Sequence, residues 1–183
     1  MNFFYQIILL QLSLVCAVNG AQNVFNIKEY VTCSLPDVWE SDGAYEHEIA
    51  GVGTIHALVL KHKDTYNNLV ICYLDPVNPD IRKHGPEILK NSFLGISAAK
   101  AAEQGETIGE KEESVKEDAI YYRLSIRASE GKDSYLRGIS FEWREGALIF
   151  HYLGYSDIDP ALFDVILKQF KSKEHSHSEV VTP

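Results

Sequence analysis

Cysteines, histidines and carboxylates are the side chains through which this chain could do chemistry, and it has three, seven and 26 of them respectively. Nucleophilic catalysis needs a serine, cysteine or threonine held beside a histidine and a carboxylate, and no Gly-x-Ser-x-Gly motif marks such a serine. Cys33 or Cys72 could pair with His56 or His151, but no spacing in the sequence selects one such pair. The sequence therefore predicts no catalytic residue and favours a protein that is not an enzyme.

Two groupings of histidine within the predicted strands are weak candidates for metal ligands. In an extended segment Glu46 and Glu48 share one face while His47 points to the other, so the three do not converge. His56 and His62 share a face but lie about 20 Å apart in an extended strand, which is too far for one ion.

A third pair, His175 and His177, lies near the carboxyl terminus and could hold zinc or copper only loosely, because it supplies two ligands. The glycines at 51 and 53 lack the lysine and the following helix of a phosphate-binding loop. The sequence thus predicts neither a metal site nor a cofactor.

The cysteines allow two interpretations. Cys16 lies in an apolar run that predicts a signal peptide, so Cys33 and Cys72 remain for an exported and therefore oxidising compartment. A disulfide between them would close a loop of about 40 residues and stabilise the fold by about 4 kcal/mol in the chain-entropy model. Alternatively both are small buried residues, because Cys33 alternates in phase with Val31 and Leu35. The pattern leaves both interpretations open.

Tyrosine and arginine recur on one side of two predicted strands. Tyr121 and Arg123 point to the same side of the first, as do Tyr135 and Arg137 of the second. Tyrosine with arginine is typical of the anchor residues of protein interfaces. These four residues are therefore the predicted binding site for a partner, with burial of the aromatic rings in the core as the alternative.

The stretch from Asp118 to Tyr155 predicts three consecutive antiparallel strands joined by two glycine-containing turns. The second and third strands, 135–143 and 147–153, are partly apolar on both faces, so we expect them in the middle of a sheet. The first strand is apolar at every second position, as a half-buried strand is, and its apolar face consists of Ile120, Tyr122, Leu124 and Ile126.

Two helices and an edge strand extend this pattern. Pro86 suits the first position of a helix over 86–104, and Asp159 with Pro160 starts a second helix over 159–171. The highly charged segment 106–118 is typical of an exposed edge strand that discourages pairing with other chains. The predicted fold class is α+β, with an antiparallel sheet of about five to seven strands.

The chain divides into three parts. The apolar run from Phe3 to Val18 predicts a cleaved signal peptide over residues 1–20, although it lacks a preceding Lys or Arg. A lipid-modified start at Cys16 or a retained anchor is the alternative. Residues 21–172 are predicted to form one globular domain and residues 173–183 a disordered tail. We therefore expect a secreted or periplasmic protein without stable membrane insertion after cleavage.

The charge of the chain restricts its partners. Seventeen basic against 26 acidic residues give a formal net charge of −9, and residues 1–20 contribute no charged side chain. Nucleic acid and anionic membranes need a basic patch, and no cluster of lysine and arginine is present. A protein partner of unknown identity remains the expectation.

The order of elements resembles the PsbP-like superfamily. The resemblance rests on a strand that runs into Leu35-Pro36-Asp37-Val38-Trp39, on one helix after a proline-rich connection, and on the closing pattern of Phe163, Leu167 and Phe170. That superfamily includes an extrinsic photosystem protein, a nuclear transport regulator and small exported bacterial proteins. The resemblance implies an α/β/α sandwich, in which helices cover both faces of the sheet. None of the family's partner-binding residues has a counterpart here.

These observations predict an exported, non-catalytic binding or assembly domain that acts through protein contacts. The alternative is a protein that binds a small ligand or metal, or an unrecognised hydrolase, and that uses a pocket between sheet and helix. A cleft lined by His56 or His151 and a carboxylate would favour this alternative, and a filled interface would oppose it.

Overall fold

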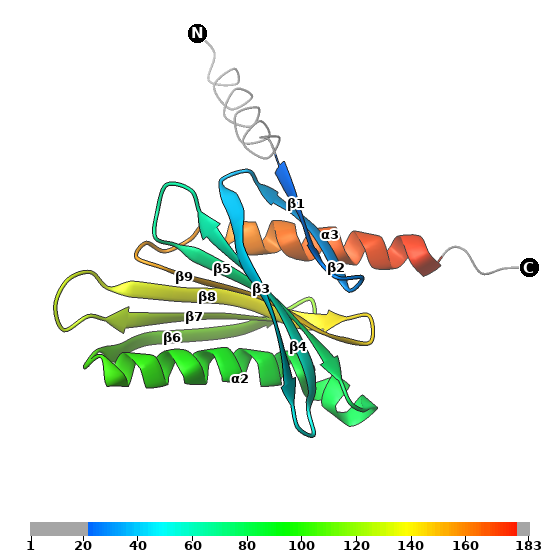
Figure 1. Cartoon of the computed structure of the whole chain (residues 1–183), viewed down its shortest axis with the longest axis horizontal. Coiled ribbons are helices and arrows are strands. Elements are labelled where there is room, and N and C mark those ends of the chain that lie inside the picture. Colours follow the sequence, from blue (N-terminus) through cyan, green and yellow to red (C-terminus); the bar gives the residue numbers. More distant parts are fainter. Residues whose placement is uncertain (1–21, 179–183) are drawn as a thin grey trace, which may run out of the picture.

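The computed structural model describes residues 22–178, with the side chains of residues 22–172. Within this part the chain forms nine strands and two helices (Figure 1). The strands are β1 (Gln22–Ile27), β2 (Val31–Pro36), β3 (Trp39–Ile49), β4 (Gly53–His62), β5 (Asn68–Pro76), β6 (Thr107–Lys116), β7 (Ala119–Arg127), β8 (Ser134–Trp143) and β9 (Gly146–Gly154). The helices are α2 (Pro79–Glu103) and α3 (Ala161–Ser178).

Seven strands form one antiparallel sheet in the order β3-β4-β5-β9-β8-β7-β6. Each strand pairs with its neighbour in the chain except at the centre, where β9 returns to pair with β5. The predicted α+β class and the antiparallel sheet of five to seven strands are confirmed. The charged segment 106–118 contains the edge strand β6, as predicted, and the two strands that were predicted to be apolar on both faces, β8 and β9, lie inside the sheet.

The two sides of the sheet contribute to two different hydrophobic clusters. On β5, Ile71 and Tyr73 belong to the cluster that also contains Phe163 and Phe170 of α3. Their neighbours Cys72 and Leu74 belong to the cluster that contains Leu89 and Leu94 of α2. The period-two alternation of a strand therefore explains why β5 is an uninterrupted apolar run.

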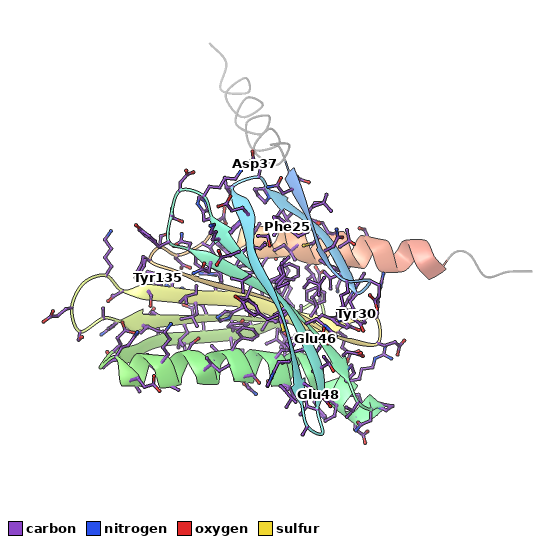
Figure 2. All side chains as sticks on the ribbon, in the orientation of Figure 1. Phe25, Tyr30, Asp37, Glu46, Glu48 and Tyr135 are labelled. Atoms are coloured by element: carbon purple, nitrogen blue, oxygen red, sulfur yellow. The ribbon has the colours of Figure 1, made fainter. Side chains whose placement is uncertain are left out.

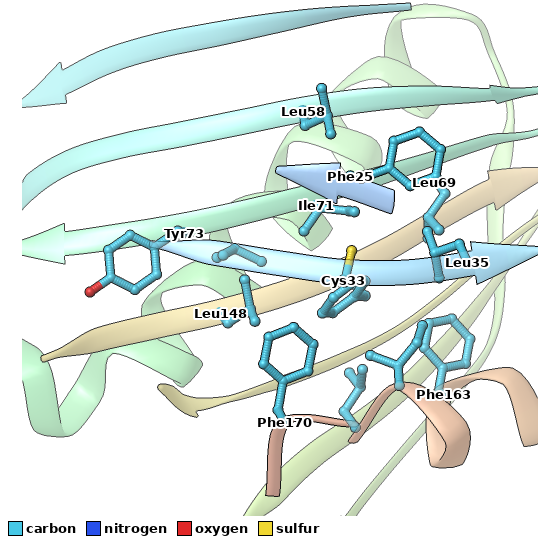
Figure 3. Packing of buried hydrophobic residues seen from close by; sticks show 14 of the residues in the cluster. Phe25, Cys33, Leu35, Leu58, Leu69, Ile71, Tyr73, Leu148, Phe163 and Phe170 are labelled. Atoms are coloured by element: carbon cyan, nitrogen blue, oxygen red, sulfur yellow. The ribbon is translucent and has the colours of Figure 1, made fainter. Parts of the chain in front are cut away.

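Strands β1 and β2 form a separate two-stranded sheet that the sequence did not predict. Phe25, Cys33 and Leu35 of this hairpin are buried in the same cluster as Leu69 and Ile71 (Figure 3). The side-chain amide of Gln169 in α3 accepts from the Ser34 N–H at 3.1 Å and donates to the Ser34 carbonyl at 2.9 Å. It thereby takes the place of a neighbouring strand and joins the hairpin to α3.

The disulfide that the sequence left open between Cys33 and Cys72 does not form. Cys33 and Cys72 are both buried and are not bonded to each other. Cys33 lies in the cluster with α3 and Cys72 in the cluster with α2, so the sheet separates them. Of the two interpretations, the one with two buried apolar cysteines is correct.

Helix α2 starts earlier than predicted, at Pro79 instead of Pro86. Asn78 caps it, because its Oδ1 accepts from the N–H groups of Asp80 and Ile81 at 3.0 Å each. Pro86 therefore lies inside the helix. Gly85 beside it allows close packing, since an added Cβ would lie 2.7 Å from the Cβ of Ala147 in β9.

Helix α3 continues to Ser178, beyond residue 172, where the predicted globular domain ends. Residues 179–183 of the predicted tail lie outside the described residues, and so does the predicted signal peptide. Neither helix in the described part of the chain has the length and apolar composition needed to cross a membrane.

Candidate functional site

The structure brings the four predicted binding residues together, and we call them the Tyr/Arg surface. Tyr121 and Arg123 lie on β7, and Tyr135 and Arg137 on β8. Arg123 is directly opposite Arg137 in the strand register, and its guanidinium carbon lies 5.6 Å from the centre of the Tyr135 ring. Figure 2 shows Tyr135 near the start of β8.

One carboxylate holds both arginines of this surface. Asp157 accepts two hydrogen bonds from Arg137, at 3.1 and 3.0 Å, and one from Arg123 Nε at 2.9 Å. The two arginine side chains are only 18% and 20% exposed. Partial burial alone would raise the pKa of Asp157, but the hydrogen bonds and charges of both arginines outweigh it and lower that pKa.

Tyr121 and Arg123 make further polar contacts within the chain. The hydroxyl of Tyr121 donates to Asp164 of α3 at 2.9 Å, and Arg123 also contacts Glu112 at 3.0 Å. Burial and the bond to Asp164 raise the pKa of Tyr121. This surface therefore attaches the start of α3 and the segment before it to the sheet. Its role as a partner-binding site stays a prediction.

His56 lies beside a carboxylate, in a depression of about 190 Å³ between the β1–β2 hairpin and β3–β4. Its side chain is only 6% exposed and stacks on the Tyr30 ring, with the ring centres 4.8 Å apart. Its Nδ1 is 3.3 Å from Glu46 Oε2 without the geometry of a hydrogen bond, and Lys28 Nζ is 2.5 Å from the same oxygen. Figure 2 shows Tyr30 and Glu46 in this part of the molecule.

His151 is buried between the sheet and α2. Its Nδ1 lies 2.6 Å from the hydroxyl oxygen of Tyr122. The centre of its imidazole ring lies 4.8 Å from the centre of the Phe93 ring of α2. Burial lowers the pKa of His151 to about 4 and raises the pKa of the Cys72 thiol to about 12. Both groups are therefore neutral at physiological pH, and Cys72 has no thiolate with which to act as a nucleophile.

No group of three or more His, Cys, Asp or Glu side chains in the described part of the chain is placed to hold a metal ion. His47 and Glu48 are exposed on β3, and Figure 2 shows Glu48 near the end of that strand. His175 and His177 lie in the last turns of α3, beyond the residues whose side chains are described.

A larger cleft, of about 550 Å³, lies where strand pairing stops, and we call it the edge cleft. Strand β7 pairs with β8 only as far as Ile120 opposite Ser140, whereas β8 continues to Trp143. The last three residues of β8 pair with β9 alone. The residues that define the edge cleft are Phe141, Glu142 and Trp143 of β8, Lys83, Pro86 and Glu87 of α2, Glu117, Asp118 and Ile120 around the β6–β7 turn, and Phe170 and Lys171 of α3.

The floor of the edge cleft is aromatic and its rim is charged. Phe141, Trp143 and Phe170 are buried, and the first two pack on the Phe170 ring, which is centred 4.7 Å from that of Trp143. The rim has four carboxylates against two lysines. Glu142 and Asp118 take part in no ion pair among the described residues.

Two of the four non-glycine residues with positive φ in the described part of the chain lie on the same rim. Glu117 and Asp118, the two residues of the β6–β7 turn, have φ values of 52° and 61°. This left-handed region is costly for residues other than glycine, by about 1 kcal/mol each. The turn therefore holds its two carboxylates over the cleft at an energetic cost. Sequence reasoning did not mark the edge cleft, because its residues form no motif.

The sequence matches no model of a known protein family and no curated protein. Among solved structures, this chain is similar to the crystal structure of PA94, a Pseudomonas aeruginosa protein of unknown function. The two chains are 16% identical over 90% of this chain and 98% of that one, with a TM-score of 0.30.

Proposed function

We propose that this protein is an exported, non-catalytic binding domain that takes up an extended segment of a partner protein in the edge cleft. One observation carries the proposal: Phe141–Trp143 of β8 lie in the cleft without a neighbouring strand on the β7 side. An extended peptide can join such an edge through main-chain hydrogen bonds, and pockets for its alternate side chains then provide specificity.

The two outer edges of the sheet are less suited to this role. Strand β6 is exposed along its length, carries five charged residues and shifts register between Ile108 and Lys111. Strand β3 shifts register between Ser41 and Gly43 and is acidic. Charges and bulges of this kind are the features by which edge strands avoid pairing. The end of β8 instead lies over a buried aromatic floor and between two helices.

We infer an α/β/α sandwich of the PsbP-like kind, in which α2 covers one side of the sheet and α3 covers the other together with the β1–β2 hairpin. The separate clusters around Leu89 and Phe170 support this arrangement. Export rests on the predicted signal peptide over residues 1–20, and mass spectrometry of the secreted protein tests it.

Binding of a small ligand beside His56 is a second candidate function. The observation in its favour is the buried Nδ1 of His56, which lines a depression and has no hydrogen-bond partner in the described part of the chain. A buried polar atom without a partner is uncommon. Small polar molecules that bind there should shift the NMR signals of Tyr45 and His56, and the shift of the Tyr45 signals should vanish in His56→Ala.

Selection from a displayed random peptide library, followed by NMR, tests the proposed function. Peptides that bind the edge cleft should slow hydrogen exchange of those backbone amides of Phe141–Trp143 that point away from β9, and should shift the indole signal of Trp143. A version of the same peptide with methylated backbone nitrogens should bind at least tenfold more weakly, because it cannot donate to the strand. Selected peptides that leave these amides unprotected would contradict strand addition at β8.

A further inference from the structure

We infer that the segment bound in the edge cleft alternates basic and apolar residues, with the basic side chains facing α2 and the apolar ones facing the aromatic floor. This inference rests on the proposed function, since it assumes a strand added beside β8. It assigns the partner a chemistry: an extended, unpaired stretch of polypeptide with lysine or arginine at every second position.

The side chains of β8 alternate between two sides of the sheet within the cleft. Ser140 faces α2, because its hydroxyl donates to the Pro86 carbonyl at 2.9 Å, and Glu142 therefore faces the same side. Phe141 and Trp143 face the other side, where both contact the Phe170 ring of α3. The exposed end of β8 thus has an acidic side and an aromatic side.

A strand added beside β8 follows the same period of two. Residues directly opposite each other on neighbouring strands place their side chains on the same face, with Cβ atoms about 5 Å apart. A residue opposite Glu142 therefore points toward Glu142, and the residues on either side of it point toward Phe141 and Trp143. The partner must satisfy both environments in turn.

The side of the cleft that Glu142 occupies is acidic. Glu87 of α2 lines this part of the cleft and forms an ion pair with Lys90. Asp118 lies on the rim, and Lys83 is the basic residue of α2 that lines the cleft. Across the whole rim four carboxylates face two lysines, and Lys171 lies 3.7 Å from Glu117. The uncompensated charge is negative, as is the net charge of −9 of the whole chain. Both favour a basic segment.

The same charges disfavour other occupants. An acidic segment would place its carboxylates against Glu142, where like charges on neighbouring strands are destabilising. A second copy of this chain would offer one of its two outer edges, and both are acidic: β3 carries four carboxylates, and β6 carries three against two lysines. An uncharged apolar segment would cover Glu142 without giving it a partner, and a buried unpaired charge is costly.

Three synthetic peptides with blocked ends test the inference against the full-length protein without residues 1–20. The first is Lys-Ile-Lys-Val-Lys, the second is Glu-Ile-Glu-Val-Glu, and the third, Lys-Lys-Ile-Val-Lys, has the composition of the first without its alternation. Binding is measured by NMR titration and followed at the Phe141–Trp143 amides. We expect the first peptide to bind at least tenfold more tightly than either of the others, and its affinity to fall with added salt.

A charge reversal in the protein provides the matched control. Glu142→Lys should weaken the first peptide at least tenfold and reverse the preference in favour of the acidic peptide. Glu48→Lys makes the same change at an exposed position of the opposite edge strand β3 and should leave both affinities unchanged. Folding of each variant is checked by its amide spectrum, and Asp118→Lys provides an independent reversal on the rim.

The outcomes separate this inference from the proposed function. If all three peptides protect the Phe141–Trp143 amides equally, strand addition holds and the basic alternation is wrong. If the first peptide binds as well when its backbone nitrogens are methylated, strand addition itself is wrong. If the protein dimerises through Phe141–Trp143 of β8 and Glu142→Lys makes it monomeric, a second copy is the occupant and the inference is overturned.

Discussion

The Tyr/Arg surface and the edge cleft lie toward opposite ends of β8, and α3 passes from one to the other. Asp164 near the start of α3 accepts from Tyr121, whereas Phe170 and Lys171 near its middle line the cleft. The Tyr/Arg surface has the composition of an interface, but its arginines are already bound to Asp157. Glu142 in the cleft makes no such bond among the described residues, so availability, not composition, distinguishes the two regions.

The largest effect on stability should come from reversing a charge in the Tyr/Arg surface. Arg137→Glu places a carboxylate against Asp157 and removes a two-bond ion pair between partly buried groups. Losing one member of a buried pair costs about 3 to 5 kcal/mol, and the partial exposure here reduces this to about 3 kcal/mol. Urea denaturation measures the loss.

The control for Arg137→Glu is Arg127→Glu, which changes the same residue type at an exposed position of β7. It should change the unfolding free energy by less than about 0.5 kcal/mol. Equal stability of the two variants would show that Asp157 does not hold Arg137 in solution, and the Tyr/Arg surface would then be as available to a partner as the edge cleft is.

Acid should destabilise the fold because it favours protonation of the buried His151. Because burial lowers its pKa from 6.5 to about 4, the unfolded chain binds more protons than the folded chain between these two values. Stability should therefore fall by roughly 2 to 3 kcal/mol as the pH drops from 6.5 to 4. Denaturation across this range measures the slope, and binding assays belong above it.

The double variant Tyr122→Phe with His151→Leu is the control for this slope. It replaces both partners of the buried hydrogen bond by apolar groups, which is nearly neutral when the shapes are similar. Its stability at neutral pH should stay within about 1 kcal/mol of the original, and its decline between pH 6.5 and 4 should be shallower. An unchanged slope would assign the acid sensitivity to other groups.

Asp157→Asn should have the next largest effect, a loss of about 2 kcal/mol at neutral pH, because two partly buried arginines lose their shared carboxylate. The lowered pKa of Asp157 fixes the pH dependence of this loss. The contribution is fully present above the ordinary pKa of an aspartate, and it disappears as the pH falls through the lower pKa of the folded state. The stability curves of the two proteins should therefore converge only below the ordinary pKa of an aspartate.

Much of the fold could be predicted from period and turn signals. The alternation from Ile120 to Ile126 predicted β7, and the apolar strands after it predicted the centre of the sheet. The start of α2 was missed because Asn78 and Pro79 form a stronger start than Pro86. The β1–β2 hairpin was missed because its attachment depends on Gln169, a residue 135 positions from Ser34 in the chain.

The candidate site was harder to predict, because it depends on which backbone groups are left without a partner. Strand alternation placed Tyr121 with Arg123, and Tyr135 with Arg137, on the same side of their own strands. It could not show that the two pairs lie side by side or that Asp157 pairs with both arginines. The edge cleft did leave a signal. The turn between β7 and β8 sets a register in which Ile120 lies opposite Ser140. A strand that continues to Trp143 must therefore extend past the start of β7.

The smallest effect on stability should be that of Glu142→Gln, which removes the carboxylate from the edge cleft. Since Glu142 is exposed and makes no ion pair in the described part of the chain, the unfolding free energy should change by less than about 0.5 kcal/mol. Glu113→Gln makes the same substitution where the carboxylate is bound to the buried Lys90 at 2.9 Å, and it should cost at least about 1 kcal/mol. Urea denaturation of both variants tests whether the charge of Glu142 is available. A loss at Glu142 as large as that at Glu113 would mean that the fold itself uses this carboxylate, and the contrast between the two regions would fail.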